Sequence, residues 1–259
     1  MIDAHVHLER GTYTAEWLSE FVTAAKSAGI TELCLLDHSY NFREFTPLYD
    51  DLRRRSDFID RWLTRKAGTR TLDEYFRFAE TMRQRDWGIT IRFGLEVCFL
   101  PEQIESARQL LNDAPLDFTV GSIHFIDDFA FDHTPELWQG IDVDHAYRRF
   151  FELSAELAQS RLFDGIAHPD SVKLFGHVPS FSLEESYDIL AAALAESGMY
   201  AEQNSGISRR TSAAPGMAPG LYAAMKRHHV PIRTASDAHT PSDVGAKIQG
   251  FYEKRHLCL

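Results

Sequence analysis

The chain opens with Met1-Ile2-Asp3-Ala4-His5-Val6-His7, an apolar strand pattern that carries two histidines separated by one residue. Alternate side chains of a β-strand point to the same face, so His5 and His7 project together and can bind one ion. A His-x-His pair also arises by chance in a chain with 12 histidines. The motif alone leaves both interpretations open, and the rest of the sequence decides between them.

Five further apolar or β-branched runs end in residues of the types that bind metals. These residues are Asp37 and His38, Glu96, His124, His168, and Asp237 with His239. An unpaired polar group at the end of a buried strand costs free energy, which favours a ligand role for His124 and His168. The other histidines fall in expected loops or on helical faces, and we expect none of them to bind metal. They are His133, His145, His177, His228, His229 and His256.

The expected strands alternate with helices seven times, which is typical of parallel βα units. No glycine-rich turn of the nucleotide-binding type supports an open sheet. We therefore predict an α/β fold in which seven βα units close into a barrel. The active sites of such barrels lie at the C-terminal strand ends, where every candidate ligand of this chain falls.

Length, composition and charge limit the functions that are possible for this chain. With 259 residues and 44% hydrophobic content, the chain is expected to form one domain over residues 1–259. The formal net charge of -11 argues against a polyanion-binding surface, so no nucleic-acid partner is expected. The sequence contains no sign of oligomeric state.

No apolar run approaches the length of a membrane span, and the strand at residues 1–7 leaves no room for a secretory signal. A cytoplasmic protein without membrane contact is expected. Cys34, Cys98 and Cys258 are odd in number and far apart in the sequence, so we expect no disulfide framework.

Residues 39–71 are expected to form a long polar connection, and its second half is locally basic. Two interpretations stay open for 53–70: a solvated helical face with Phe58, Ile59, Trp62 and Leu63 turned inward, or direct contact with a substrate. The basic residues are Arg53, Arg54, Arg55, Arg61, Arg65, Lys66 and Arg70.

Six histidines, one glutamate and one aspartate exceed the three or four protein ligands that one divalent ion needs. At least two metals are therefore implied, with Glu96 able to bridge them. Two close ions stabilise an in-line displacement at phosphorus, so this ligand set indicates hydrolysis of a phosphate ester. Histidine and carboxylate ligands suit Zn, Mn and Fe alike.

The ordered set of ligands resembles the PHP (polymerase and histidinol phosphatase) superfamily of metal-dependent phosphoesterases. This resemblance spans nearly the whole chain and implies a distorted seven-stranded (β/α)7 barrel. Three shorter segments are similar to the histidinol-phosphate phosphatase branch: 121–126 followed by Phe131-Asp132, His168-Pro169-Asp170 with 173–176, and 202–207.

The resemblance implies two or three divalent metal ions. It assigns the first to His5, His7, Glu96 and Asp237, the second to Glu96, His124 and His168, and two ligands of a third to His38 and His239. Family members commonly have another histidine shortly after His-x-His, where this chain has Glu9 nearby. Glu9 or a water could replace that histidine, or the third site could be weak or empty.

The activity implied is hydrolysis of L-histidinol phosphate to L-histidinol and phosphate, a step of histidine biosynthesis. A hydroxide bridging the ions would attack phosphorus, and Asp237 or His239 could protonate the leaving alkoxide. Two alternatives remain. The substrate could be another sugar or nucleotide monophosphate or a diester, or the barrel could bind metal and ligand without catalysis.

Substrate contacts are expected after the sixth strand, where Asn204 precedes a loop that carries Arg209 and Arg210. This loop should rise from the same barrel face as the metals, where a guanidinium could bind phosphoryl oxygens. Adjacent residues of an extended loop face opposite ways, so only one of the two arginines should point inward. The other interpretation is a pair of exposed loop arginines; resemblance to the histidinol-phosphatase branch favours a phosphate contact.

Overall fold

Seven parallel strands follow one another around the sheet in chain order. The structure is a computed structural model that describes residues 1–211 and 213–251. The strands are β1 (Ile2–His7), β2 (Glu32–His38), β3 (Thr90–Cys98), β4 (Phe118–Ser122), β5 (Gly165–Ile166), β6 (Tyr200–Asn204) and β7 (Ile232–Ala235). A parallel bridge joins Val6 to Ala238, and the His7 amide donates to the Ala238 carbonyl at 2.7 Å. These contacts nearly close the sheet, which confirms the predicted seven-stranded barrel.

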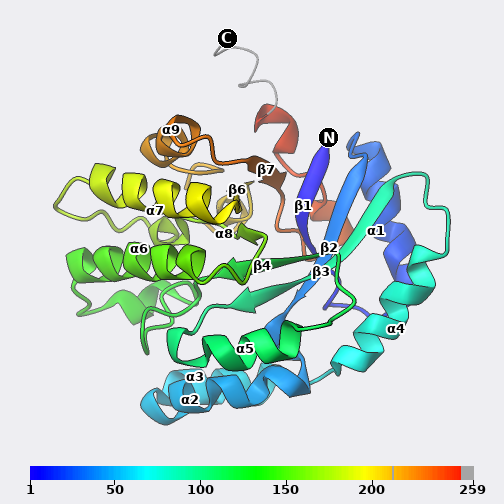
Figure 1. Cartoon of the computed structure of the whole chain (residues 1–259), viewed down its shortest axis with the longest axis horizontal. Coiled ribbons are helices and arrows are strands. Elements are labelled where there is room, and N and C mark those ends of the chain that lie inside the picture. Colours follow the sequence, from blue (N-terminus) through cyan, green and yellow to red (C-terminus); the bar gives the residue numbers. More distant parts are fainter. Residues whose placement is uncertain (212, 252–259) are drawn as a thin grey trace.

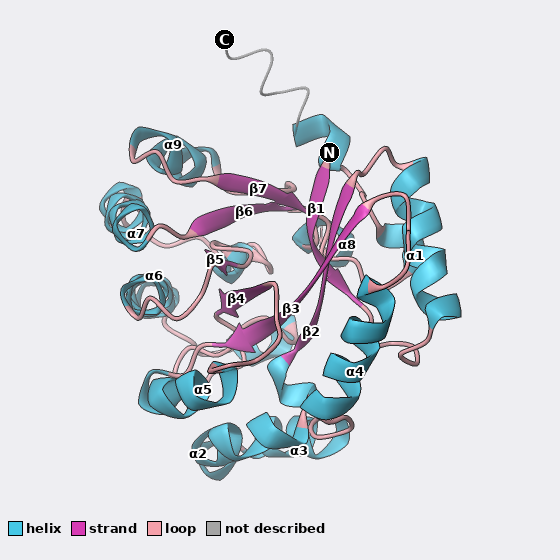
Figure 2. Ribbon diagram, turned by 45° about the vertical axis from the view of Figure 1, so that its right-hand side comes forward, coloured by secondary structure: helices cyan, strands magenta, loops and turns pink. Residues whose placement is uncertain are grey.

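Helices surround the strands (Figures 1 and 2). The main ones are α1 (Ala15–Ser27), α4 (Leu72–Arg83), α5 (Ile104–Leu111), α6 (Val143–Gln159), α7 (Glu184–Ser197) and α9 (Pro219–Arg227). Shorter helices lie in the connections: α2 (Asp50–Arg55), α3 (Asp57–Lys66) and α8 (Ile207–Arg210). Six 3₁₀ segments complete the described elements: η1 (Ser39–Asn41), η2 (Arg43–Tyr49), η3 (Pro101–Gln103), η4 (Pro135–Trp138), η5 (Ser171–Lys173) and η6 (Pro241–Asp243).

Helix α1 illustrates how the sequence fixes these elements. The Thr14 side chain accepts a hydrogen bond from the Trp17 amide and so caps the helix start. The apolar stripe that contains Phe21, Val22 and Ala25 is buried against the barrel. Helices of this kind leave the carboxyl ends of the strands free to carry the functional side chains.

The connection after β2, expected as a long polar segment, contains regular structure. It contains η1, η2, α2 and α3, and in α3 Ile59 and Leu63 are fully buried. The helical interpretation of residues 53–70 is thus confirmed. None of the basic side chains of that segment lines the main cavity of the described structure.

The remaining features of the fold are its lack of an apolar spanning helix among the described residues and the state of its cysteines. Among the described residues, no helix combines the length and apolarity needed to span a membrane. Cys34 and Cys98 are buried and free. Cys258 and His256 lie outside the described residues.

Candidate metal centre

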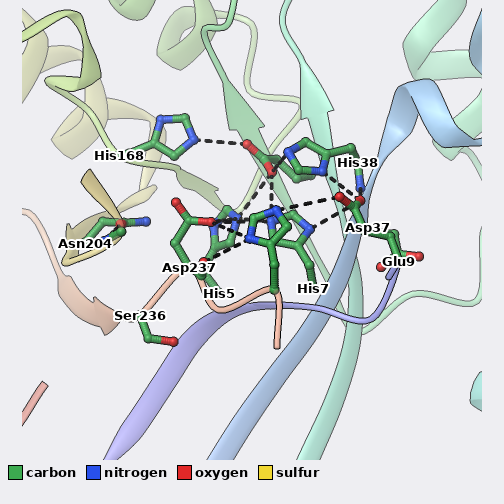
Figure 3. Close-up of polar contacts among 12 residues, drawn as sticks. His5, His7, Glu9, Asp37, His38, His168, Asn204, Ser236 and Asp237 are labelled. Carbon is green, nitrogen blue, oxygen red and sulfur yellow. Dashed lines mark hydrogen bonds and ion pairs between the residues drawn. The ribbon is translucent and has the colours of Figure 1, made fainter. Parts of the chain in front are cut away.

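The register of the first three strands brings the predicted ligands together. In the pairing of β2 with β3, His38 lies opposite Glu96. His5 and His7 both lie on β1 with no exposed surface. Figure 3 shows these side chains converging with Asp237, which follows β7. Strand β3 continues two residues beyond Glu96, to Cys98, so this ligand sits within the strand rather than at its predicted end.

The first group of donor atoms consists of two imidazole nitrogens and a carboxylate. His5 Nε2 lies 2.9 Å from His7 Nε2, and Glu96 Oε2 lies 3.2 Å and 3.4 Å from these two nitrogens. Asp237 Oδ1 is 3.7 Å from His7 Nε2. Donor atoms this close in a buried site match the coordination of one divalent ion.

The second group uses the other oxygen of Glu96. His124 Nε2 and His168 Nε2 lie 2.9 Å and 3.1 Å from Glu96 Oε1. Because its two oxygens face different sets of histidines, Glu96 can bridge two ions. His38 Nε2 also approaches Glu96, at 3.2 Å from Oε2.

A third group forms around Glu9, the residue at which the sequence departs from its resemblance. Glu9 Oε2 lies 2.8 Å from His38 Nδ1 and 3.7 Å from His7 Nδ1, and Glu9 Oε1 lies 3.6 Å from His239 Nε2. The four side chains offer ligand atoms within 4.8 Å of one another. Glu9 therefore occupies the position where a third ion would need a further ligand.

Electrostatics and hydrogen bonding both fit metal ions here. Burial raises the pKa of Glu96, but neighbouring His38, His5 and His124 outweigh it and hold this pKa well below its usual range. Burial, together with the nearby histidine rings, lowers the pKa of His7 well below its usual value, so the neutral ring keeps one nitrogen with a free lone pair. The Nδ1 atom of His7, which lies 3.7 Å from Glu9 Oε2 in the third group, is buried without a hydrogen-bond partner. Buried, unsatisfied ligand atoms are what a metal centre would use.

Two carboxylates that the sequence did not assign hold the histidines in place. Glu202 is fully buried and accepts a 2.8 Å hydrogen bond from His5 Nδ1–H. Asp132 accepts in the same way from His124 Nδ1–H at 2.7 Å. Such partners fix the tautomer, so that the opposite nitrogen, Nε2, faces the ion. The sequence contained one signal of this role for Glu202: it is a charged residue within a strand that is otherwise expected to be buried.

The backbone around Asp237 is strained and braced. Asp237 has φ 57°, a left-handed conformation that costs free energy for residues other than glycine, although Asp tolerates it better than most. Asp3 accepts hydrogen bonds from the Ser236 amide at 2.8 Å and the Ser236 hydroxyl at 2.6 Å. A Cβ on Gly206 would lie 2.4 Å from Asp237 Oδ2, so only glycine permits this approach. These contacts aim the Asp237 carboxylate at the histidines.

Both predicted arginines line the cavity, which corrects the expectation that only one would point inward. The segment is the short helix α8 rather than an extended loop, so adjacent side chains do not diverge to opposite faces. Arg209 donates through both terminal nitrogens, to the Ser236 and Asp237 carbonyls. Arg210 uses Nη2 alone, donating to the Asp132 carbonyl at 2.7 Å and to that of His133 at 3.1 Å.

Asn204 is engaged within the protein. Its amide group donates to Glu202 Oε2 at 2.9 Å, and its carbonyl oxygen accepts from the Gly206 amide at 2.7 Å. The residue does not line the main cavity in the described structure. The predicted substrate contact of Asn204 stays a prediction, and the geometry gives it a supporting position instead.

The ligands open onto a cavity of about 630 Å³. Its wall combines the predicted ligands His38, Glu96, His124, His168, Asp237 and His239 with three arginines, Arg10, Arg209 and Arg210. A cavity of this size accommodates a small organic molecule. Metal ligands at one side and guanidinium groups at another make it chemically suited to a small phosphate ester.

Comparisons with known proteins agree with this geometry. A Deinococcus radiodurans protein named "Probable histidinol-phosphatase" is 28% identical over 257 residues, covering 96% of this chain and 90% of the relative. A proposed histidinol phosphatase from Listeria monocytogenes has a similar structure, with a TM-score of 0.75, 17% identity and coverage of 97% of this chain and 100% of the other.

Histidinol phosphate phosphatase from Lactococcus lactis, solved with zinc, L-histidinol and phosphate, has a TM-score of 0.69 at 20% identity. The match covers 98% of this chain and 92% of that chain. At these identities the two solved structures establish a shared fold. The sequence model of the PHP domain matches residues 3–206. Since this match spans most of the chain and the structure supplies the expected barrel and ligand cluster, the chain belongs to the PHP domain family.

Proposed function

We propose that the protein is a metal-dependent phosphomonoesterase that hydrolyses L-histidinol phosphate to L-histidinol and phosphate. The observation that carries this proposal is the position of Glu96, whose two oxygens face two separate sets of histidines at one end of a small-molecule cavity. The name of the Deinococcus relative, and the L-histidinol and phosphate in the Lactococcus structure, favour this substrate over other small phosphate esters.

Two or three divalent ions, when bound, would polarise the phosphoryl group and lower the pKa of a water molecule. The donor set suits Zn, Mn or Fe, and the Lactococcus structure contains zinc. His5, His7, Glu96 and Asp237 would hold one ion, and Glu96, His124 and His168 another. Asp237 and His239 both line the cavity, where either could deliver a proton to the leaving alkoxide.

We also propose that residues 1–259 act as one catalytic domain. The family match ends at residue 206, whereas Asp237 and His239 reach the centre from beyond β7. The later segment therefore belongs to the same functional unit. The proposal includes a small phosphorylated substrate, a cytoplasmic location and no nucleic-acid partner; the net charge of -11 supports the last of these.

The direct test is phosphate release by the purified protein after loading with Zn, Mn or Fe. L-Histidinol phosphate should have a higher kcat/KM than sugar phosphates, nucleoside monophosphates and phosphodiesters, and a chelator should abolish its turnover. Faster hydrolysis of another ester would move the assignment to that substrate. Turnover that survives complete metal removal would overturn the mechanism.

Replacing Glu9 by glutamine tests the third metal position. Loss of the carboxylate charge beside His7, His38 and His239 should reduce bound metal from three to two equivalents per chain, measured by elemental analysis. The kcat/KM value should fall about 10-fold, as for other changes around a metal site. Glu16→Gln, on the exposed side of α1, serves as the control and should leave both quantities unchanged. Equal metal content in the Glu9 variant and the wild type would contradict the assignment.

Replacement of the two arginines should affect different measured quantities. Arg210→Ala should lower kcat/KM about 10-fold, with unchanged metal content, through loss of a charged hydrogen bond to phosphate. Arg209→Ala should instead weaken metal retention, because its guanidinium holds the Ser236 and Asp237 carbonyls. Elemental analysis and steady-state kinetics on both variants check this division. If both variants kept wild-type kinetics, neither arginine would contact the phosphate.

A further inference from the structure

An aromatic wall lies beside the metal ligands in the cavity. It consists of Tyr40, Trp62, Phe125 and His133, all of which line that space. Trp62 is its centre: its ring meets those of His133 and Tyr40 edge-on, with centroids 4.6 Å and 4.8 Å apart. Phe125 follows at 6.3 Å. Aromatic pairs in this geometry attract one another, so the rings form a preorganised surface.

The wall is joined to the metal centre at two points. The Tyr40 ring stacks on His38 with centroids 4.9 Å apart. Asp132 accepts hydrogen bonds from His124 Nδ1–H and His133 Nδ1–H, both at 2.7 Å. A substrate whose phosphate binds at the metals could therefore reach the aromatic wall through a short chain of atoms.

Half of the wall comes from the connection between β2 and α4, and the other half, Phe125 and His133, from the connection between β4 and α6. Tyr40 belongs to η1 and Trp62 to α3. Helix α3 buries Ile59 and Leu63 in the protein core, which fixes the side that carries Trp62. Trp62 and Tyr40 are themselves only partly buried, although both are large aromatic side chains. The apolar surface they leave open faces a cavity rather than a protein partner, which is typical of a ligand-binding wall.

We propose that this wall is a subsite for a flat ring on the leaving alcohol of the substrate, with Trp62 as the specificity-determining residue. This inference rests on the proposed phosphatase function. The phosphate lies at the metals, and the ring of the alcohol packs against Trp62 and Phe125. His133, whose Nδ1–H donates to Asp132, has Nε2 as an acceptor for a ring N–H of the substrate.

The imidazole of L-histidinol phosphate suits this subsite. It is flat, it has one donor and one acceptor nitrogen at neutral charge, and a three-carbon chain separates it from the phosphate. Burial of a ring against Trp62 removes apolar surface from water, whereas an ester without a ring gains nothing from the wall. The subsite therefore selects the alcohol, while the metals and Arg210 act on the phosphate common to all esters.

The test compares two substrates that share an amino group and a phosphate. L-Histidinol phosphate carries the ring, and 2-aminoethyl phosphate lacks it. The metal-loaded Trp62→Ala variant should lose about 10-fold more kcat/KM for the first substrate than for the second. Trp62→Phe should restore most of the difference, because it keeps an aromatic face. Trp87→Ala changes a tryptophan between α4 and β3 that does not line the cavity; it is the matched control and should leave the ratio unchanged.

An equal loss for both substrates in Trp62→Ala, or no loss for either, overturns the subsite. Thermal unfolding and metal analysis of each variant exclude a general defect, and Trp62→Phe supplies the comparison if the alanine variant fails to fold. Failure of the proposed function has a different signature: the wild type would not hydrolyse L-histidinol phosphate. In that case benzyl phosphate and ethyl phosphate replace L-histidinol phosphate and 2-aminoethyl phosphate as the two substrates. A preference for the benzyl ester that depends on Trp62 would still support the subsite, and its absence would overturn it.

Discussion

Replacing Glu96 with alanine is expected to abolish phosphatase activity, with a fall in kcat/KM of at least about 1000-fold, or about 4 kcal/mol of transition-state stabilisation. The two oxygens of this buried carboxylate lie within 3.4 Å of nitrogens from His5, His7, His38, His124 and His168. Without it, both groups of donor atoms lose their shared anionic ligand. Elemental analysis should therefore find at most one metal equivalent per chain, held by the group around Glu9.

The control for this experiment is Glu105→Ala, which removes a carboxylate whose side chain is 75% exposed on α5. It should keep full metal content and activity. Circular dichroism should show that the Glu96 variant remains folded. A folded Glu96 variant with wild-type turnover would favour the alternative in which the barrel binds metal without using it for catalysis.

Replacing Glu202 with alanine should weaken metal affinity about 100-fold, although Glu202 lines no part of the main cavity. Its Oε1 accepts from His5 Nδ1–H at 2.8 Å, and its Oε2 accepts from the His168 amide at 3.3 Å and from Asn204 at 2.9 Å. Burial lowers the pKa of His5, but the negative charges of Glu202 and Glu96 together outweigh it and raise this pKa well above its usual value, which makes the ring a stronger ligand base. Removing Glu202 frees the ring to rotate and to change tautomer.

A competition titration against a chelator measures this effect directly. When the Glu202→Ala variant is saturated with metal, its kcat should lie closer to the wild-type value than its metal affinity does. The reason is that Glu202 positions a ligand and does not touch the substrate. Glu202→Gln should rescue part of the affinity, because an amide oxygen can still accept from His5. Glu196→Ala, an exposed carboxylate near the end of α7, is the control. Unchanged metal affinity in Glu202→Ala would show that His5 is oriented by packing alone.

The barrel and most candidate ligands could be predicted because each follows from local sequence. A short apolar run that ends in histidine or a carboxylate specifies both a buried strand and a polar strand end, as at His7 and His38. Parallel topology then collects such ends at one side. No long-range information was needed, since chain order and strand direction fix which ends meet.

The elements missed are those whose role depends on tertiary context. Helix α3 was expected as one of two interpretations, with Ile59 and Leu63 turned inward, but the place of Trp62 at the cavity was not. A charged strand residue such as Glu202 is usually exposed to solvent. Its role is recognised only once the barrel places His5 beside it. The inward direction of both Arg209 and Arg210 depends on the helical conformation of α8, which sequence polarity did not reveal.

The closure of the barrel also determines when the centre can form. Asp3 and Ser236, which join β1 to the chain after β7, are separated by 233 residues, and the His7 amide bonds to Ala238. Contacts between such distant residues form late because a long loop must first be closed. During synthesis, β1 leaves the ribosome long before Asp237 and His239 exist. The groups that use His5 and His7 then lack Asp237 and His239, so we expect these two groups to bind metal only after the whole chain has been made.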